Sequence, residues 1–190
     1  MYNLIVFASG NGSTLQAIID SINNNYLKAQ INLVVSDNPN AYALQRAQNS
    51  NIPTYIIQNK KFNDRDLELE NVLSKYNIDL IVLAGYLKMI GPKLIEKYRI
   101  INTHPSLLPK YGGKGMHGMN VHKAVIAAKE TKSGATIHFV NQEYDKGTII
   151  SQTEVKILPS DTAESLSQKV QAAEKIQLIN VLNQFTNNLI

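Results

Sequence analysis

Residues 4–18 read Leu-Ile-Val-Phe-Ala-Ser-Gly-Asn-Gly-Ser-Thr-Leu-Gln-Ala-Ile. The apolar run at residues 4–8 is too short for a helix and ends in a turn that contains Gly10 and Gly12. Apolar residues then return at helical spacing, beginning with Leu15 and Ile18. The stretch therefore predicts a buried strand, a tight turn and a helix, which together open a strand-helix-strand unit.

The alternation of strand and helix continues through the first hundred residues. Apolar segments predict strands at 31–35, 52–57, 80–84 and 100–104, and helical spacing predicts helices at 40–50, 64–76 and 92–98. The fourth strand, 80–84, is apolar throughout, as is typical of a central strand covered on both faces. Strands separated by helices imply a parallel sheet, so we predict a doubly wound, Rossmann-like α/β fold.

The second half of the chain has a different pattern. A helix is expected at 121–129, followed by strands at 135–140 and 148–157 that a short turn joins into an antiparallel hairpin. Asp161 and Glu164 resemble a capping box that opens a long C-terminal helix, with Ile176 on its inner face. The prediction is a mostly parallel sheet with an antiparallel C-terminal hairpin, in a single domain over residues 1–190, since a domain has roughly 150 residues.

Composition excludes several classes of protein. The absence of cysteine rules out a disulfide scaffold, a zinc-thiolate or iron–sulfur site and a cysteine nucleophile. The 19 basic and 15 acidic residues are scattered and give a net charge of +4, so we expect no nucleic-acid partner. Apolar runs of five residues fall far short of the roughly 20 that cross a membrane, and the N-terminus does not resemble a signal peptide. We therefore expect a cytoplasmic protein with no membrane partner.

The glycine turn suggests an anion site. It lies between a strand and a helix, where free backbone N–H groups and the helix dipole favour a phosphate group. It is not a dinucleotide fingerprint, because the third glycine would fall at Leu15 and the acidic residue Asp37 lies in a tight turn. The alternative is a plain strand–helix turn without a ligand.

Asn102 and His104 form the candidate catalytic pair. Two positions apart at the end of a predicted strand, they project to the same face at the sheet edge where α/β proteins bind ligands. An amide and an imidazole side by side suit the stabilisation of an oxyanion. Asp145 is the carboxylate expected to raise the pKa of His104 and keep the ring cationic, so activity should fall on the alkaline side. The alternative is that His104 caps a strand and Asp145 is an ordinary turn residue.

Five segments resemble the family of folate-dependent glycinamide ribonucleotide transformylases. The resemblance covers essentially the whole chain, in the family's order. The segments are Ser-Gly-Asn-Gly-Ser-Thr-Leu-Gln-Ala-Ile at 9–18, Leu-Ala-Gly-Tyr-Leu-Lys-Met-Ile at 83–90, Asn-Thr-His-Pro-Ser-Leu-Leu-Pro at 102–109, Tyr-Asp-Lys-Gly at 144–147 and Val-Gln-Ala-Ala-Glu at 170–174.

The resemblance implies a formyl transfer from 10-formyltetrahydrofolate to the amine of phosphoribosylglycinamide, in purine biosynthesis. It implies that Asn102 and protonated His104 stabilise the oxyanion and that Asp145 tunes His104. Residues 1–100 would be the phosphoribosyl-binding half, and residues 101–190 the catalytic and folate-binding half. No metal is implied, and the chain would be a monomer or a homodimer.

The resemblance also assigns binding roles to particular residues. The residues implied for the phosphoribosyl substrate are Gly12, Ser13, Thr14, Gln171 and Glu174. The residues implied for the folate are Arg65, Leu87, Lys88, Met89, Ile90, Asn141, Gln142, Glu143 and Tyr144.

Four positions depart from the family pattern, and the glycine-rich stretch 112–118 is longer than in compact members. Thr136 stands where serine is common, and Lys88 replaces a frequent arginine. Thr14 stands where asparagine is common, and Asn120 stands where the family has the first histidine of a pair. Rivals on the same scaffold are methionyl-tRNA formyltransferase and formyltetrahydrofolate deformylase, which normally carry an additional C-terminal or N-terminal domain that we do not expect in 190 residues. A rival of another class is a non-catalytic phosphate- or folate-binding module.

Overall fold

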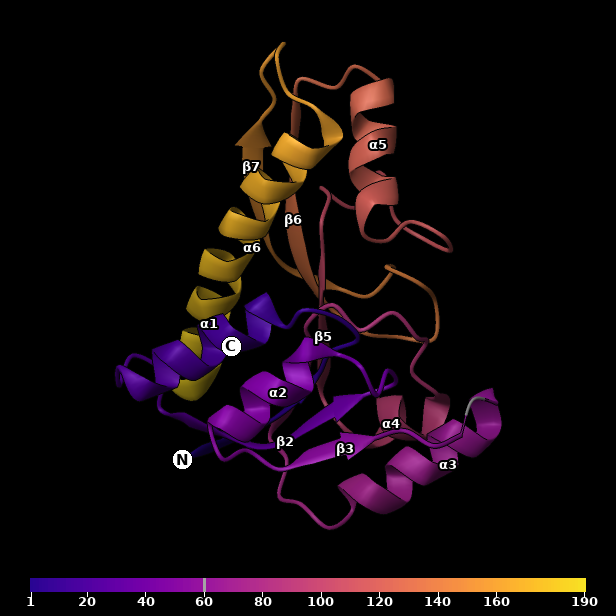
Figure 1. Ribbon diagram of the computed structural model, residues 1–190, viewed down its shortest axis with the longest axis vertical. Helices are drawn as coiled ribbons and strands as arrows, with labels where there is room; N and C mark the ends of the chain where they lie inside the picture. Colours follow the sequence, from indigo (N-terminus) through magenta and orange to yellow (C-terminus); the bar gives the residue numbers. More distant parts are fainter. Residues whose placement is uncertain (60) are drawn as a thin grey trace. The chain divides into compact units, whose positions relative to one another are not determined.

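The computed structural model describes residues 1–59 and 61–190 of the chain. Strands and helices alternate along most of this length (Figure 1). In order they are β1 (Tyr2–Phe7), α1 (Ser13–Asn23), β2 (Ala29–Ser36), α2 (Tyr42–Asn49), β3 (Thr54–Ile56), α3 (Phe62–Leu73), β4 (Leu80–Leu83), α4 (Pro92–Lys97), β5 (Ile100–His104), α5 (Met119–Ala127), β6 (Lys132–Phe139), β7 (Ile149–Lys156) and α6 (Ala163–Thr186).

The described strands form a seven-stranded sheet in the order β3-β2-β1-β4-β5-β6-β7. β1 runs parallel to both β2 and β4, and β2 runs parallel to β3. β6 and β7 pair antiparallel, with Thr136 opposite Gln152. The predicted α/β class, the mostly parallel sheet and the antiparallel C-terminal hairpin are confirmed.

The chain divides into two compact units. Unit 1 consists of residues 1–101 and 182–190, and unit 2 consists of residues 102–181. The division falls inside β5, directly before Asn102. The division of roles between residues 1–100 and 101–190 stays a prediction.

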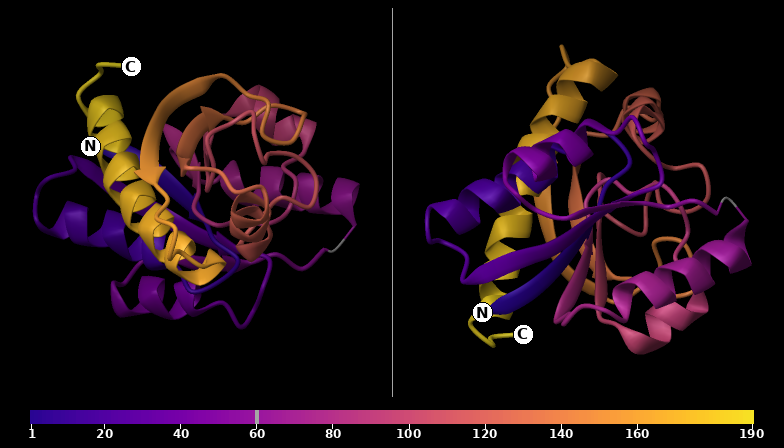
Figure 2. Two further views of the ribbon diagram at one scale, coloured as in Figure 1. Left: turned by 90° about the horizontal axis from the view of Figure 1, so that it is seen from above. Right: turned by 60° about the horizontal axis from the view of Figure 1, so that its bottom comes forward.

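Unit 1 has a fully apolar sheet centre because its inner strands carry long aliphatic side chains. Residues 4–7 in β1 and 80–82 in β4 have no exposed surface. Helices α1 and α2 lie side by side, and so do α3 and α4, with strands of the sheet between the two pairs (Figure 2). α1 buries Leu15, Ile18 and Ile19, the face that its sequence spacing predicts.

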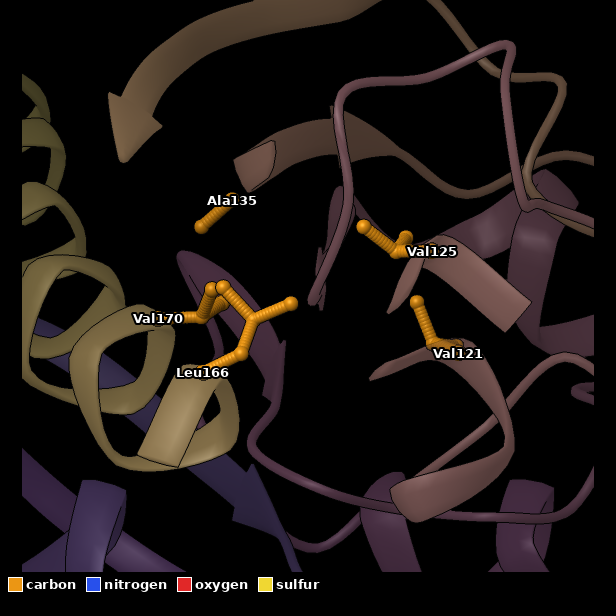
Figure 3. Close-up of a cluster of buried hydrophobic side chains, with 5 residues drawn as sticks. All are labelled: Val121, Val125, Ala135, Leu166 and Val170. Carbon is orange, nitrogen blue, oxygen red and sulfur yellow. The ribbon is translucent and has the colours of Figure 1, made fainter. Parts of the chain in front are cut away.

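The core of unit 2 lies between α5, β6 and α6. It is built from Val121, Val125, Ala135, Leu166 and Val170, whose side chains point toward one another (Figure 3). Each is at most 1% exposed. Burial of a valine or leucine side chain stabilises a fold by about 1.5–3 kcal/mol, so this cluster anchors β6, the strand next to β5 in the sheet.

The start of α6 differs from the prediction by one residue. Thr162 and Ser165 form the reciprocal capping pair: Ser165 N donates to Thr162 Oγ1 over 3.2 Å, and Thr162 N donates to Ser165 Oγ over 3.0 Å. Asp161 instead accepts from Leu158 N and pairs with Lys169. The predicted box of Asp161 and Glu164 was therefore wrong.

The inner face of α6 also differs from the prediction. Ile176 is 66% exposed, whereas its neighbour Gln177 is 5% exposed and donates from Nε2 to Ser151 Oγ. The inward position on α6 is therefore occupied by the polar side chain of Gln177, which has its hydrogen-bond partner on β7. Among the described residues, no helix is both long and apolar enough to cross a membrane.

Candidate active site

β5 carries the candidate catalytic pair, as predicted, and it does so within unit 2. The strand ends at His104, so Asn102 and His104 leave the sheet on one face at its carboxyl edge. His104 is 3% exposed, and Asn102 is half-buried. The predicted strand at 100–104 is confirmed to the residue.

The amide of Asn102 is oriented by a histidine of β6. Nδ1 of His138 lies 2.8 Å from the carbonyl oxygen of Phe139, so this nitrogen carries the proton. In the neutral ring the other nitrogen, Nε2, is then an acceptor, and Nδ2 of Asn102 lies 3.2 Å from it. The contact uses one of the two amide hydrogens of Asn102 and leaves the second for another acceptor.

His104 faces an acceptor on each side of its ring. Nε2 lies 2.8 Å from the carbonyl oxygen of Tyr111, to which it donates. Nδ1 lies 3.4 Å from Oδ2 of Asp145. The structure therefore brings together the three residues predicted to be catalytic, Asn102, His104 and Asp145.

The carboxylate of Asp145 lies close to the rings of both His104 and His138. Its backbone is in the left-handed region with φ of 55°, a conformation that aspartate tolerates better than most residues. Its Oδ2 also accepts from Gly113 N over 2.8 Å, and its Oδ1 lies 3.6 Å from His138 Nε2. Burial raises the pKa of the Asp145 carboxyl, but the two histidines, in their protonated forms, and the Gly113 amide outweigh burial and lower that pKa.

The predicted direction of the His104 pKa shift is wrong in the ligand-free protein. Burial lowers the pKa of its imidazole, and Asp145 and the Tyr111 carbonyl, which both raise the pKa, only partly offset burial. The net pKa lies below the ordinary value of 6.5. In its neutral form the ring carries its proton on Nε2, the nitrogen that donates to the Tyr111 carbonyl.

The turn after His104 is fixed by a pair of side chains on the β6–β7 hairpin. Thr136 Oγ1 donates to Ser106 O over 2.6 Å and accepts from Leu108 N over 3.1 Å. Gln152 Nε2 donates to both Thr136 Oγ1 and Leu108 O, each over 2.9 Å. Thr136 has no exposed surface, so its two bonds to the turn lie in a water-free environment, whereas Gln152 is exposed.

Sequence reasoning missed the groups that hold His104 and Asp145. The Tyr111 carbonyl and the Gly113 amide are backbone atoms, and His138 was not among the predicted site residues. One signal was the glycine-rich stretch at 112–118: a Cβ on Gly112 would lie 2.5 Å from Leu108 Cδ2 and 3.2 Å from Asp145 Cβ. Glycine at position 112 lets the loop pass close to Leu108 and to the candidate catalytic residue Asp145.

The two predicted substrate residues on α6 have different environments. Glu174 is 8% exposed, and its Oε1 accepts from Thr103 Oγ1 over 3.1 Å. Thr103 lies between the candidate catalytic residues, so Glu174 is tied to the same strand. Gln171 is exposed and donates to Ser167 Oγ over 3.2 Å.

The predicted phosphate loop lies in unit 1. Gly12 is in the left-handed region with φ of 74° and immediately precedes α1, which begins at Ser13. Gln16 N donates to Gly12 O over 2.9 Å, which closes the first helical turn. The amides of Ser13 and Thr14 therefore belong to the positive end of the helix dipole, as predicted.

The predicted folate residues 87–90 of unit 1 lie in one segment, which two hydrogen bonds hold in place. Leu87 N donates to Ser9 Oγ over 3.1 Å, and Arg65 Nη2 donates to Met89 O over 3.0 Å. Lys88 is exposed and Ile90 is buried. Arg65 itself is 8% exposed, so it supports the backbone of the segment.

The predicted folate residues of unit 2 lie on an exposed turn. Asn141 Oδ1 accepts from Glu143 N over 3.0 Å, and Glu143 pairs with Lys146. Gln142 and Tyr144 are also exposed.

The remaining histidines do not form a metal site in the described part of the chain. Over those residues, no group of three histidine, aspartate or glutamate side chains is placed to hold a metal ion. His122 is 2% exposed, and burial followed by the proximity of His104 lowers its pKa. His117 is exposed on the loop before α5.

The sequence matches the formyl transferase family over residues 2–182, and this match defines the class of the protein. The phosphoribosylglycinamide formyltransferase of Haemophilus influenzae is 38% identical, over 92% of this chain and 82% of its own length. The chloroplastic phosphoribosylglycinamide formyltransferases of Arabidopsis thaliana and Vigna unguiculata are 39% and 41% identical, each over 88% of this chain. The chain spans 59% and 55% of the length of these two plant relatives.

Solved structures show the same relationship. The phosphoribosylglycinamide formyltransferase of Coxiella burnetii, solved in complex with CHES, is 39% identical with a TM-score of 0.90, over 98% of this chain and 88% of that chain. Glycinamide ribonucleotide transformylase 1 of Symbiobacterium toebii is 30% identical with a TM-score of 0.92, over 99% of this chain and 89% of that chain. The chain belongs to the formyl transferase family and, within it, to the phosphoribosylglycinamide formyltransferases.

Proposed function

We propose that the chain transfers a formyl group from 10-formyltetrahydrofolate to the amine of phosphoribosylglycinamide, a step of purine biosynthesis. The observation that carries the proposal is the contact set of Asn102, His104 and Asp145 in unit 2. Its members are an oriented amide, a buried imidazole and a carboxylate, which are the groups that a formyl transfer through an oxyanion needs. The names of the relatives support the choice of acceptor.

Asn102 stabilises the charge that develops on the formyl oxygen. When the amine attacks the formyl carbon, a C–N bond forms and the carbonyl electron pair moves onto oxygen. One amide hydrogen of Asn102 is engaged by His138, and the second donates to this oxyanion. Because His138 fixes the amide before the reaction, the donor needs no reorientation in the transition state.

His104 acts as the proton carrier. Its ring enters the reaction neutral, because burial lowers its pKa, and takes up the proton that the attacking nitrogen releases. The proton binds Nδ1, where the Asp145 carboxylate 3.4 Å away stabilises the imidazolium. The imidazolium then supports the oxyanion, and it returns the proton to the folate nitrogen as the bond from that nitrogen to the formyl carbon breaks.

The binding roles are proposed for the same residues as the sequence suggests. Gly12, Ser13 and Thr14 bind the phosphate through the amide-rich start of α1. Gln171 and Glu174 contact other groups of the phosphoribosyl substrate. The folate is bound by Arg65, by the backbone of Leu87, Lys88, Met89 and Ile90, and by the turn of Asn141, Gln142, Glu143 and Tyr144. None of these roles requires a metal.

A formyl-transfer assay tests the proposal. The release of tetrahydrofolate from 10-formyltetrahydrofolate is followed spectrophotometrically with and without phosphoribosylglycinamide. Release that depends on the acceptor, with formylated acceptor detected by mass spectrometry, supports the transferase. Release without acceptor identifies a hydrolase, and binding of both molecules without release identifies a non-catalytic module.

A further inference from the structure

Arg46 of α2 is attached to the glycine loop by three hydrogen bonds. Its Nε donates to the carbonyl oxygen of Asn11 over 2.9 Å, and its Nη2 donates to Oδ1 of the same residue over 3.0 Å. Its Nη1 donates to Gln16 Oε1 over 3.1 Å. The guanidinium also lies 4.8 Å from the ring centroid of Tyr42. These contacts fix both the side chain and the backbone of Asn11.

The bond to Asn11 O sets the direction of the next amide. In a planar trans peptide the carbonyl and the following N–H point in opposite directions. With Asn11 O held toward Arg46, the N–H of Gly12 points away from α2. The carbonyl of Gly10 is held in the same way, because it accepts from Ala43 N over 3.1 Å, so the N–H of Asn11 also points away from α2.

The loop packs closely against α2 at Gly12. A Cβ on Gly12 would lie 2.7 Å from both Cα and Cβ of Ala43. Glycine at position 12 lets the loop touch α2, and Arg46 one helical turn beyond Ala43 fixes its orientation. Two successive amides directed the same way beside a helix N-terminus form a concave donor set for an anion.

We propose that Arg46 is a positioning residue for the phosphate of the acceptor: it acts by holding the Asn11–Gly12 peptide in its anion-binding orientation, not by contacting the phosphate. This inference rests on the proposed function, since it deepens the role of the glycine loop. The inference predicts that a positive charge at position 46 is not sufficient for tight binding of the acceptor phosphate. The planar fork of arginine is required, because it holds the backbone oxygen and Oδ1 of Asn11 together.

Kinetics of Arg46→Lys and Arg46→Gln test the inference. Both variants should raise KM for phosphoribosylglycinamide by about tenfold or more, the range for losing hydrogen bonds to a charged group, while kcat and KM for the formyl donor stay within about twofold. Arg46→Lys keeps the charge, so wild-type kinetics in this variant would overturn the proposal. A fall in kcat with unchanged KM would also overturn it.

Lys97→Gln is the matched control. It removes one positive charge from an exposed side chain of α4 in the same unit. Its KM for the acceptor should equal that of the wild type. A rise equal to that of Arg46→Gln would show that net charge, and not loop orientation, sets acceptor affinity.

A second measurement does not depend on turnover. Inorganic phosphate is titrated into 15N-labelled wild-type protein and Arg46→Lys, and amide resonances are followed by NMR. The Gly12 amide should shift on phosphate addition in the wild type and not in the variant. Equal shifts in both proteins, or no shift in the wild type, would overturn the proposal. If wild-type protein binds phosphate at Gly12 but does not transfer a formyl group, the proposed function fails while the role of Arg46 stands.

Discussion

The side-chain amide of Asn102 donates to Nε2 of His138 over 3.2 Å, and the opposite nitrogen of His138 donates to the Phe139 carbonyl over 2.8 Å. The backbone of β6 thus selects the tautomer of His138, and the tautomer selects the orientation of Asn102. The proposed oxyanion donor on β5 is therefore oriented by a residue 36 positions away in the sequence.

Loss of the His138 acceptor should reduce turnover. In His138→Phe the amide of Asn102 has no fixed partner, so we expect kcat to fall about tenfold, less than for removal of an oxyanion donor itself. Steady-state kinetics with both substrates saturating measures this. His138→Gln restores an acceptor oxygen and should recover part of the loss. Equal kcat in wild type and His138→Phe would show that Asn102 is oriented without His138.

His104 should titrate below its ordinary pKa of 6.5. Since the neutral ring accepts a proton in the proposed mechanism, kcat should be constant above this pKa and fall as pH drops through it. The free amine of the acceptor titrates near about 8, as an α-amino group does. Its titration changes kcat/KM, so the pH profile is measured on kcat at saturating acceptor. NMR titration of the imidazole gives the pKa directly. A value above 7, with kcat falling on the alkaline side, would restore the cationic ring that the sequence suggested.

Stability should decrease on mild acidification. His104 and His122 both have lowered pKa values in the fold, so the unfolded chain binds more protons below about pH 6.5 and unfolding becomes easier as pH falls. Urea unfolding at pH 7 and pH 5 should give a smaller free energy of unfolding at pH 5. His122→Leu removes one of the two groups and should reduce the difference. A larger free energy at pH 5 would mean that these rings are charged in the fold. Asp145 does not interfere in this window, because its lowered carboxyl pKa lies further toward acid.

The hydroxyl of Thr136 should contribute strongly to stability. Thr136→Val leaves Ser106 O and Leu108 N in a buried environment with weakened or lost partners, which should cost about 2–4 kcal/mol in the free energy of unfolding. Thr136→Ser keeps the hydroxyl and loses only a buried methyl group, at about 1 kcal/mol. Urea unfolding of the three proteins checks this. A loss in Thr136→Val no larger than that in Thr136→Ser would contradict a strong contribution of the hydroxyl.

The sequence was informative where local pattern determines structure. The strand Ile100–His104 ends directly before Pro105, and the hairpin of β6 and β7 follows from two extended segments and a turn. The capping box was displaced by one residue because Asp161 and Thr162 are both good caps. Asp161 is used by Lys169 and Leu158, which only the folded chain reveals.

The electrostatics of the site were not accessible from the sequence. Asp145 was visible as the partner of His104, but the degree of burial that reverses the pKa shift depends on tertiary packing. The Tyr111 carbonyl and the Gly113 amide could not be identified from residue type, because every residue has the same backbone groups. Arg46 was missed because its role depends on the contact between α2 and the glycine loop.

Turnover of Asn102→Ala tests the catalytic assignment most directly. With wild-type formyl transfer to phosphoribosylglycinamide as the reference, the variant should lose about 10²–10³-fold in kcat, the loss measured when an oxyanion donor is removed. KM for both substrates should stay within about threefold, since the amide acts mainly in the transition state. An unchanged kcat would contradict the account, because the oxyanion would then be stabilised without the amide that β5 and His138 hold in place.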